Sequence, residues 1–180
     1  TLNLNIIKLG LLIYDQDMTI FLKNKHTLQI NDFNFHCCIG EKGLTKRKNE
    51  GDKKTPIGTF RINSLYYRGD RMEAPKTKLK QIRIKKSMGW CDDIKSPKHY
   101  NSLMTIRRNI KHEKLFRKDS KYDLLIPIEY NSRRIVGKGS CIFIHLTKNY
   151  KSTLGCIALK KKDFLIMLKI IEKRTKIKIS

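Results

Sequence analysis

Two stretches near the C-terminus decide the fold and the chemistry of this chain: Cys141-Ile142-Phe143-Ile144-His145-Leu146 and Ser152-Thr153-Leu154-Gly155-Cys156-Ile157-Ala158-Leu159. Each contains a short apolar run of the kind that forms a buried strand. The first run ends in a histidine, and a turn of small residues places a cysteine at the start of the second. The loop between them is long enough to bring both side chains to the same end of neighbouring strands. This arrangement predicts a cysteine nucleophile, Cys156, with His145 as its base.

The glycine before the cysteine supports this interpretation, because Gly155 lets the backbone approach a substrate carbonyl closely. The backbone amides of Gly155 and Cys156 are then placed to face a developing oxyanion. The two stretches alone leave a structural alternative open. In that alternative, Cys156 is a buried strand thiol and His145 is a hydrogen-bonded histidine at the rim of the sheet.

The rest of the chain has the pattern of a mainly β domain, since short runs rich in Ile, Phe, Leu and Tyr recur between polar breaks. The two residues Asn31 and Asp32 predict a tight hairpin turn. We expect strands at residues 19–22, 26–30, 33–39, 59–67, 81–84, 124–128, 141–146 and 155–159, and a further one within residues 6–14.

Apolar residues at helical spacing predict a C-terminal helix over residues 163–174, with Asp163 as its N-cap. A weaker pattern predicts a second peripheral helix at residues 109–117. The residues that we expect to face the core from the C-terminal helix are Phe164, Met167, Leu168 and Ile171.

Composition narrows the class of protein. The chain has 180 residues, which fits a single domain over residues 1–180. It has 40 Lys and Arg against 16 Asp and Glu, a formal net charge of +24, and should attract polyanions. The densest basic runs, such as Lys46-Arg47-Lys48, lack interleaved aromatic residues, so we interpret them as solvated surface and expect no specific nucleic acid partner. The alternative function is a non-enzymatic, basic nucleic-acid-binding module.

The sequence indicates neither a membrane-spanning segment nor a metal site. No apolar run approaches the ~18 residues that cross a bilayer, so we expect no transmembrane segment. The five cysteines have no metal-type spacing, so no metal site is predicted. We interpret the four apart from Cys156 as buried free thiols, namely Cys37, Cys38, Cys91 and Cys141.

A second block of sequence carries a family signature. Gly40-Glu41-Lys42-Gly43-Leu44 leads into Glu50-Gly51-Asp52-Lys53-Lys54-Thr55-Pro56-Ile57-Gly58-Thr59-Phe60. Taken alone, its Thr-Pro-Ile-Gly segment indicates only a turn. Together with the block from His145 to Cys156, it resembles the catalytic domain of the L,D-transpeptidase family, also called the YkuD domain. The resemblance spans about residues 27–172.

A middle block resembles one branch of that family. Gly89-Trp90-Cys91-Asp92-Asp93 and a later Tyr100-Asn101 match segments that form an insertion beside the active site in this branch. Aromatic residues there are expected to wall a groove, and acid and amide groups to meet a peptide. Hydrogen bonds that stabilise loops are an equally supported interpretation of the Asp and Asn residues. The substrate-binding residues that we predict are Trp90, Asp92, Asp93, Tyr100, Asn101, Thr153 and Leu154.

The resemblance implies a β-sandwich or barrel-like fold with a few peripheral helices, and cysteine acyl transfer on peptidoglycan stem peptides. Cys156 would attack an L-D peptide bond while His145 protonates the leaving amine. The amides of Gly155 and Cys156 would hold the oxyanion, and the carbonyl of Leu146 would orient the imidazole. The resulting thioester would pass to an amine, which gives a cross-link, or to water, which is L,D-carboxypeptidase activity. No cofactor is implied, and the family implies a periplasmic or cell-envelope location.

Two positions depart from the family pattern. Leu154 stands where many members carry His, and Ala158 where many carry Arg or Asn. The loop from His145 to Cys156 is also shorter than in many relatives. Sequence therefore leaves open the donor peptide, the acceptor and the oligomeric state.

Overall fold

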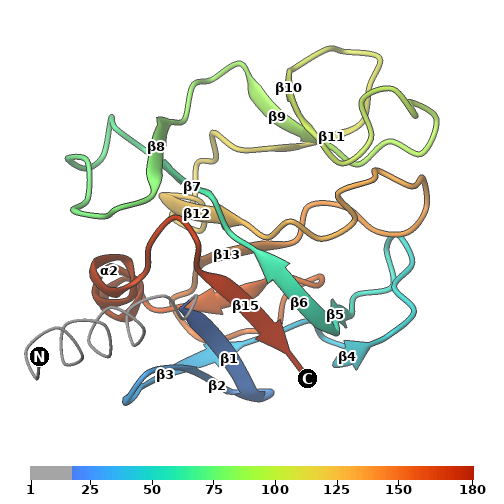
Figure 1. Ribbon diagram of the computed structural model, residues 1–180. Coiled ribbons are helices and arrows are strands. Elements are labelled where there is room, and N and C mark those ends of the chain that lie inside the picture. The colour runs from blue at the N-terminus through green and yellow to red at the C-terminus, as the bar shows by residue number, and fades with distance from the viewer. Residues whose placement is uncertain (1–17) are drawn as a thin grey trace, which may run out of the picture.

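The computed structural model describes residues 18–180, and these residues form a mainly β structure with one helix (Figure 1). The strand that we expected within residues 6–14 lies outside the described residues. The strands are β1 Thr19–Asn24, β2 Thr27–Ile30, β3 Phe33–Cys38, β4 Leu44–Thr45, β5 Thr55–Pro56, β6 Gly58–Arg61, β7 Ser64–Tyr67, β8 Lys80–Arg83, β9 Met88–Cys91, β10 Leu103–Thr105, β11 His112–Lys114, β12 Leu124–Pro127, β13 Phe143–Leu146, β14 Ile157–Leu159 and β15 Lys176–Ile179. The helix is α2, Lys161–Ile170.

Ten of these strands form one curled sheet, in the order β6-β15-β1-β2-β3-β14-β13-β12-β7-β8. Only Ile62 and Asn63 separate β6 from β7 along the chain, although β6 lies at one edge of the sheet and β7 near the other. The sheet must therefore curl until its two ends approach each other. An antiparallel bridge between Ile62 and Ile128 joins them at this point. The mainly β, barrel-like prediction is confirmed.

Most of the predicted strands are present at nearly the predicted bounds. The hairpin between β2 and β3 pairs Ile30 with Phe33, and Asn31 adopts the positive φ of 50° that a tight turn requires. The predicted strand at residues 59–67 is divided into β6 and β7 at the sheet closure. The helix predicted at residues 109–117 is wrong, because this segment contains the strand β11.

The C-terminal helix is confirmed with shifted bounds. Helix α2 begins after Lys160, not at Asp163, which instead lies in the first turn, where the helix dipole favours an acidic side chain. It ends at Ile170, and the extended backbone of the C-cap residue Ile171 leads into the turn before β15. The residues expected on its core face, Phe164, Met167, Leu168 and Ile171, are all fully buried against the inside of the sheet.

The segment from β9 to β11, residues 88–114, is called the insertion below, after the expectation from sequence, and lies over one end of the curled sheet, in the upper part of Figure 1. It contains the three-stranded sheet β10-β9-β11. The ring of Trp90 on β9 packs edge to face on Phe143 of β13, with ring centroids 5.3 Å apart. Leu115, which follows β11, belongs to the same apolar cluster as Phe143 and Cys156. The insertion therefore forms one wall of the region around Cys156.

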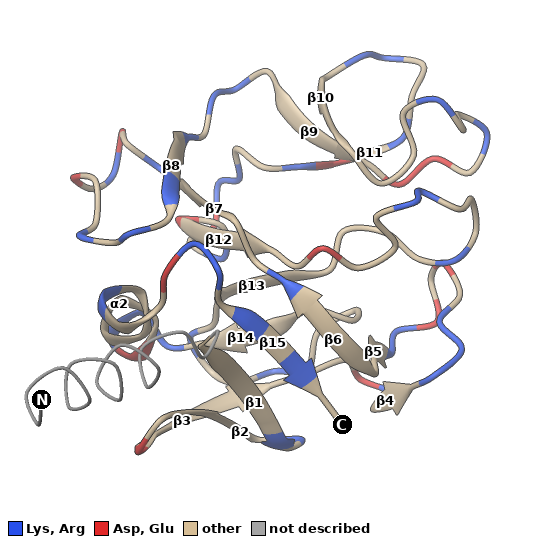
Figure 2. Ribbon diagram, viewed as in Figure 1, with Lys and Arg blue, Asp and Glu red and all other residues tan. Residues whose placement is uncertain are grey.

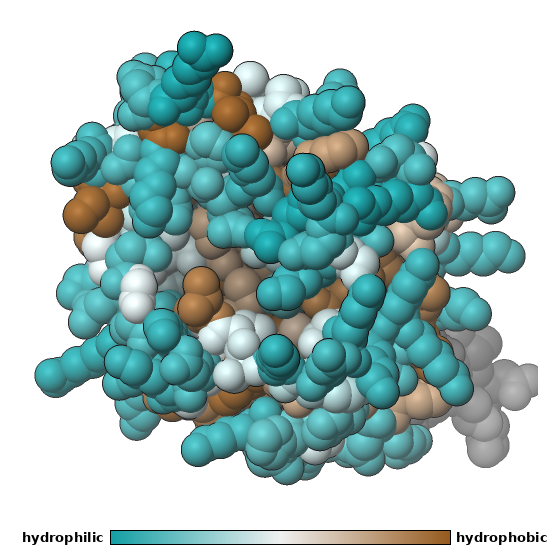
Figure 3. Space-filling view, turned by 180° about the vertical axis from the view of Figure 1, so that it is seen from behind, coloured by the Kyte–Doolittle hydropathy of each residue, from teal (hydrophilic) through white to brown (hydrophobic). Residues whose placement is uncertain are grey.

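The charge of the chain is spread widely. Lys and Arg residues occur on the sheet, on α2 and on the insertion, with no single basic stripe (Figure 2). The face seen from behind is mostly hydrophilic, with small separated apolar patches (Figure 3). Within residues 18–180, no helix is long and apolar enough to span a membrane.

Candidate active site

The neighbouring strands β13 and β14 bring Cys156, just before the start of β14, and His145, near the end of β13, to one cavity. These strands are parallel, and His145 lies opposite Ala158. Cys156 precedes Ala158 by two residues, and alternate residues of a strand share a face, so Cys156 and His145 lie on the same side of the sheet. Both side chains line a cavity of about 810 Å³. The cysteine and histidine that the sequence singled out therefore share one site.

The thiol of Cys156 is buried among backbone groups. The amide of Phe143 donates to its Sγ at 3.4 Å, and Sγ lies 3.2 Å from the carbonyl oxygen of Cys141, to which it donates. Burial raises the pKa of Cys156 to about 12, although the Phe143 amide acts in the opposite direction. At neutral pH the resting group is therefore a thiol.

The imidazole of His145 is held by its own strand. Its Nδ1 lies 2.9 Å from the carbonyl oxygen of Leu146, and the ring of Tyr122 packs edge-on against it at 5.3 Å. Burial lowers the pKa of His145 to about 4, and the Leu146 carbonyl only partly offsets this. The ring is thus neutral at pH 7, with Nδ1 donating its proton and Nε2 left as the basic nitrogen. Within residues 18–180, the hydrogen bonds of the thiol and the imidazole go to backbone groups and not to each other.

The turn before Cys156 is held by Thr153. Gly155 has a φ of +139°, and a Cβ added there would lie 2.9 Å from the carbonyl oxygen of Lys54, so no other residue fits without strain. The Gly155 amide donates to the Thr153 hydroxyl at 3.1 Å, and that hydroxyl donates to the Cys156 carbonyl at 2.6 Å. Leu154 is 73% exposed and lines the cavity together with Thr153.

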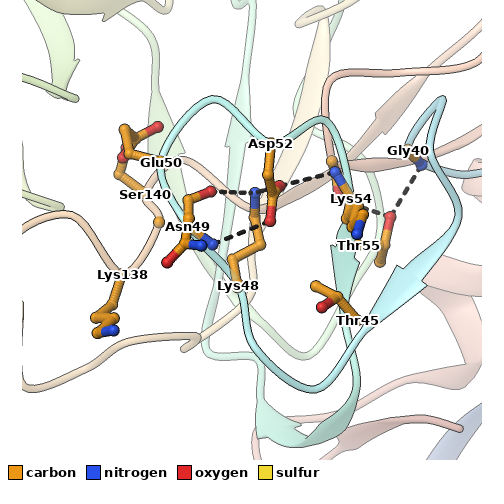
Figure 4. A network of polar contacts seen from close by, with 12 residues as sticks. Gly40, Thr45, Lys48, Asn49, Glu50, Asp52, Lys54, Thr55, Lys138 and Ser140 are labelled. Carbon is orange, nitrogen blue, oxygen red and sulfur yellow. Dashed lines mark hydrogen bonds and ion pairs between the residues drawn. The ribbon is translucent and has the colours of Figure 1, made fainter.

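The Thr-Pro-x-Gly block supports this turn from behind. Thr55 is fully buried, and its hydroxyl donates to the Gly155 carbonyl at 2.9 Å while it accepts from the Gly40 amide at 2.9 Å (Figure 4). Asp52 accepts hydrogen bonds from the amides of Asn49 and Lys54, each at 2.9 Å. The Thr-Pro-Ile-Gly segment, which the sequence alone marks as a turn, therefore supports the backbone of the turn before Cys156 through hydrogen bonds.

Glu50 joins this block to the insertion. Its carboxylate accepts hydrogen bonds from the hydroxyls of Tyr100 and Ser140. Tyr100 is fully buried, and its oxygen also accepts the Gly139 amide at 3.1 Å. The structure thus places Tyr100 beneath the site, whereas Glu50 and Ser140 line the cavity.

Trp90 and Asn101 also hold parts of the chain together through hydrogen bonds. The indole of Trp90 donates to Asn101 Oδ1 at 3.0 Å, and the Asn101 amide donates to the carbonyls of Tyr130 and Asn131 at 3.0 and 3.1 Å. Asn101 Oδ1 also accepts the Cys141 amide at 3.3 Å. The Asn101 side chain therefore joins the insertion to the segment between β12 and β13, at Tyr130, Asn131 and Cys141.

The two predicted aspartates lie in different surroundings. Asp92 lines the cavity and forms an ion pair with Lys111 at 3.1 Å, while its buried Oδ1 has no partner among residues 18–180. Asp93 lies outside the cavity lining and accepts the amides of Lys95 and Lys111. Of the predicted substrate contacts, Asp92, Thr153 and Leu154 face the cavity.

Several residues that line the cavity were not singled out in the sequence. Lys48 was assigned to a solvated basic run, which is wrong, because only 5% of the residue is exposed. Other examples are Glu113, Tyr122, Ser140 and Cys141. No local pattern marks these residues, because they reach the cavity from several loops and strands that are far apart in the sequence. The five cysteines are free thiols, and of the four expected to be buried, Cys37, Cys38 and Cys91 are buried whereas Cys141 is only partly buried.

The family model of the L,D-transpeptidase catalytic domain, YkuD, matches residues 12–179. No curated protein matches the chain. A solved structure of a variant of the helical cell shape determining protein Pgp2 from Campylobacter jejuni is similar at 16% identity with a TM-score of 0.50, over 93% of this chain and 48% of that one.

Two further solved structures are similar. Bd1075 from Bdellovibrio bacteriovorus is 15% identical with a TM-score of 0.47, over 92% of this chain and 48% of that one. An L,D-transpeptidase from Mycobacterium smegmatis is 10% identical with a TM-score of 0.42, over 91% of this chain and 58% of that one. The chain thus spans about half the length of the structures it matches, and at these identities the likeness concerns the fold alone.

Proposed function

Because the chain belongs to the YkuD family of L,D-transpeptidase catalytic domains, we propose that residues 1–180 form one catalytic domain, a cysteine-dependent L,D-transpeptidase that acts on peptidoglycan stem peptides in the cell envelope. The observation that carries this proposal is the convergence of Cys156 and His145 on one cavity. The cavity of about 810 Å³ has room for a short peptide. The acyl transfer itself requires no cofactor.

In the acylation step, the sulfur of Cys156 attacks the carbonyl carbon of an L-D peptide bond while its proton passes to Nε2 of His145. The carbon–nitrogen bond then breaks, and the imidazolium returns the proton to the leaving amine. A thioester remains on Cys156. Proton transfer must accompany attack, because burial raises the pKa of the thiol to about 12 and lowers that of the imidazole to about 4.

Backbone groups around the cysteine stabilise the intermediate. The amides of Gly155 and Cys156 hold the oxyanion, for which Gly155 exchanges its present hydrogen bond to Thr153 for one to the substrate. The carbonyl of Leu146 keeps the imidazole oriented through Nδ1. Attack on the thioester by the amine of another stem then gives a cross-link, and attack by water gives L,D-carboxypeptidase activity.

The lining of the cavity has charges of both signs, as a stem peptide with ammonium and carboxylate groups requires. Asp92, Thr153 and Leu154 contact the peptide directly. The predicted residues outside the lining, Trp90, Asp93, Tyr100 and Asn101, act by holding the insertion in place. Four lysines without an ion-pair partner in residues 18–180 line the same cavity and attract the carboxylates, namely Lys118, Lys121, Lys148 and Lys151.

The test is intact-protein mass spectrometry after incubation with a tetrapeptide stem or a carbapenem. The wild-type protein should gain one acyl adduct, and Cys156→Ala should gain none. Cys141→Ala is the matched control, because it removes a thiol from the same cavity and should keep the adduct. An adduct that persists in Cys156→Ala would assign the chemistry to another residue. Nucleic-acid binding that survives this substitution, with no adduct in the wild type, would favour the basic binding module instead.

A further inference from the structure

Lys48 is the one buried lysine among residues 18–180. Its side chain is only 4% exposed, in a chain whose other described lysines reach solvent. Removal of an ammonium from water is unfavourable unless the charge is paired and hydrogen-bonded. A buried lysine in so basic a chain therefore points to a specific role for its charge.

The side chain of Lys48 runs from the loop just before the Thr-Pro block toward the turn that carries Cys156. Its ammonium pairs with Asp52 and donates to the Asn49 carbonyl at 3.2 Å (Figure 4). An ammonium has three N–H donors, so one remains for a further group. Its Nζ lies 3.6 Å from the position that a Cβ on Gly155 would occupy. The aliphatic part of the Lys48 side chain is closely packed as well. Gly139 lies so near it that a Cβ added to Gly139 would be 2.7 Å from Lys48 Cγ.

The histidine, cysteine and tyrosine that line the cavity around the thiol do not supply a positive charge. His145 is neutral, and Cys141 and Tyr122 are protonated because burial raises the pKa of each. Glu113 of β11 is acidic and raises the pKa of Cys156, whereas Lys48 lowers it. Arg117, which pairs with Glu113 at 2.9 Å, also lines the cavity but is already engaged by two carboxylates. Of the cations that line the cavity, Lys48 is thus the one that lowers the pKa of Cys156 and favours negative charge on the sulfur.

We propose that the Lys48 ammonium is the counter-charge of the site, which stabilises the Cys156 thiolate as it forms and the oxyanion that develops beside Gly155. This inference rests on the proposed acyl transfer. It divides the work between two residues, because His145 moves the proton and Lys48 balances the negative charge. Asp52 holds the ammonium in place and moderates its field, since an ion pair is a weaker source of positive potential than a free cation.

A purely structural role for Lys48 makes a different prediction. If Lys48 only fixed the loop of residues 48–54, loss of either Lys48 or Asp52 would disturb the site in the same direction. If its charge acts on the sulfur, loss of Lys48 makes Cys156 less reactive, and loss of the Asp52 charge makes it more reactive. The opposite signs separate the two explanations.

The experiment measures the rate at which iodoacetamide alkylates Cys156 between pH 7 and 10, with each cysteine assigned by peptide mapping and folding checked by circular dichroism. Lys48→Met should slow alkylation by about tenfold at a fixed pH, which corresponds to about one pKa unit. Lys48→Arg keeps the charge and should stay within about threefold of wild type, and Asp52→Asn should react faster than wild type. Lys46→Met is the control, because it removes an exposed lysine from the same segment and should change nothing.

An unchanged rate in folded Lys48→Met would overturn the inference, and so would slower alkylation in Asp52→Asn. Should Lys48→Met not fold, the sign of the Asp52→Asn effect alone decides. The assay needs no substrate, so it separates this inference from the proposed function. The proposed function fails when the acyl adduct does not form on Cys156, and the role of Lys48 fails when alkylation of Cys156 does not respond to its charge.

Discussion

The hydroxyl of Thr55 donates a hydrogen bond to the carbonyl oxygen of Gly155 across 100 residues of sequence, at 2.9 Å. The same hydroxyl accepts the amide of Gly40. One buried side chain thus joins the Thr-Pro block, the end of β3 and the turn before Cys156. The position of the cysteine depends on this contact as well as on the strand that follows it.

Substitution of Thr55 by Val keeps its shape and removes its hydroxyl. The Gly40 amide and the Gly155 carbonyl then lose a buried partner, so the free energy of unfolding should fall by about 1 to 3 kcal/mol. Urea unfolding measures this loss, and the acyl adduct on Cys156 should form more slowly. Thr59→Val, at an exposed position on β6, is the control and should change stability little. Equal stability of the two variants would show that the Thr55 hydroxyl does not hold the turn.

A second prediction concerns the backbone conformation and close packing of Gly155. Its φ of +139° and the Lys54 carbonyl, 2.9 Å from an added Cβ, both oppose a side chain. Gly155→Ala should therefore lower the free energy of unfolding by about 1 to 3 kcal/mol and move Cys156 enough to prevent acylation. Unfolding curves and the mass-spectrometric adduct measure the two effects.

The matched control for Gly155→Ala is Gly137→Ala. Gly137 also has a positive φ, 78°, but no atom lies within 4 Å of an added Cβ. This variant should lose only about 1 kcal/mol, from backbone strain, and should acylate normally. If Gly155→Ala behaved in the same way, close packing against Lys54 would not be what fixes the turn.

The sequence predicted the elements in which local pattern and buried position agree. The apolar runs around His145 and Cys156 become the central strands β13 and β14, because side chains buried on both faces leave a continuous apolar signal. Strand β15 was missed although Lys176-Ile177-Lys178-Ile179 alternates as a half-buried strand does. The predicted helix had been extended across the turn that precedes it.

The rest of the site could not be predicted because it depends on contacts between distant segments. Lys48 looks like its exposed neighbours Lys46 and Arg47 until Asp52 and the Cys156 turn close around it. Tyr100 was expected at a groove wall, but its hydroxyl meets Glu50 across 50 residues and is buried there. The sequence identifies the residue types that the chemistry needs. It does not identify their hydrogen-bond and ion-pair partners, such as Asp52 for Lys48 and Glu50 for Tyr100, because these lie elsewhere in the chain.

Asn101 allows a test of whether the insertion is braced as the hydrogen bonds indicate. Asn101→Ala leaves the Trp90 indole and the Tyr130 carbonyl without their partner, so the free energy of unfolding should fall by about 1 to 3 kcal/mol. Trp90 is the chain's single tryptophan, so its fluorescence emission reports directly on this site and should shift to the red as water reaches the ring. Asn109→Ala, at an exposed position of the same insertion, should leave both stability and emission unchanged.

Burial of His145 gives the protein a specific sensitivity to acid. Its pKa is lowered from 6.5 to about 4 in the folded protein, so the unfolded chain binds a proton at higher pH than the folded one. The contribution of His145 to stability is therefore complete above pH ~6.5 and is lost as the pH falls toward 4, by roughly 3 kcal/mol in total. His145→Gln should lose less stability than wild type between pH 7 and 4.5 in urea unfolding. His26→Gln removes an exposed histidine and should keep the wild-type acid dependence, and an unchanged slope in His145→Gln would mean that the imidazole is not buried in its neutral form.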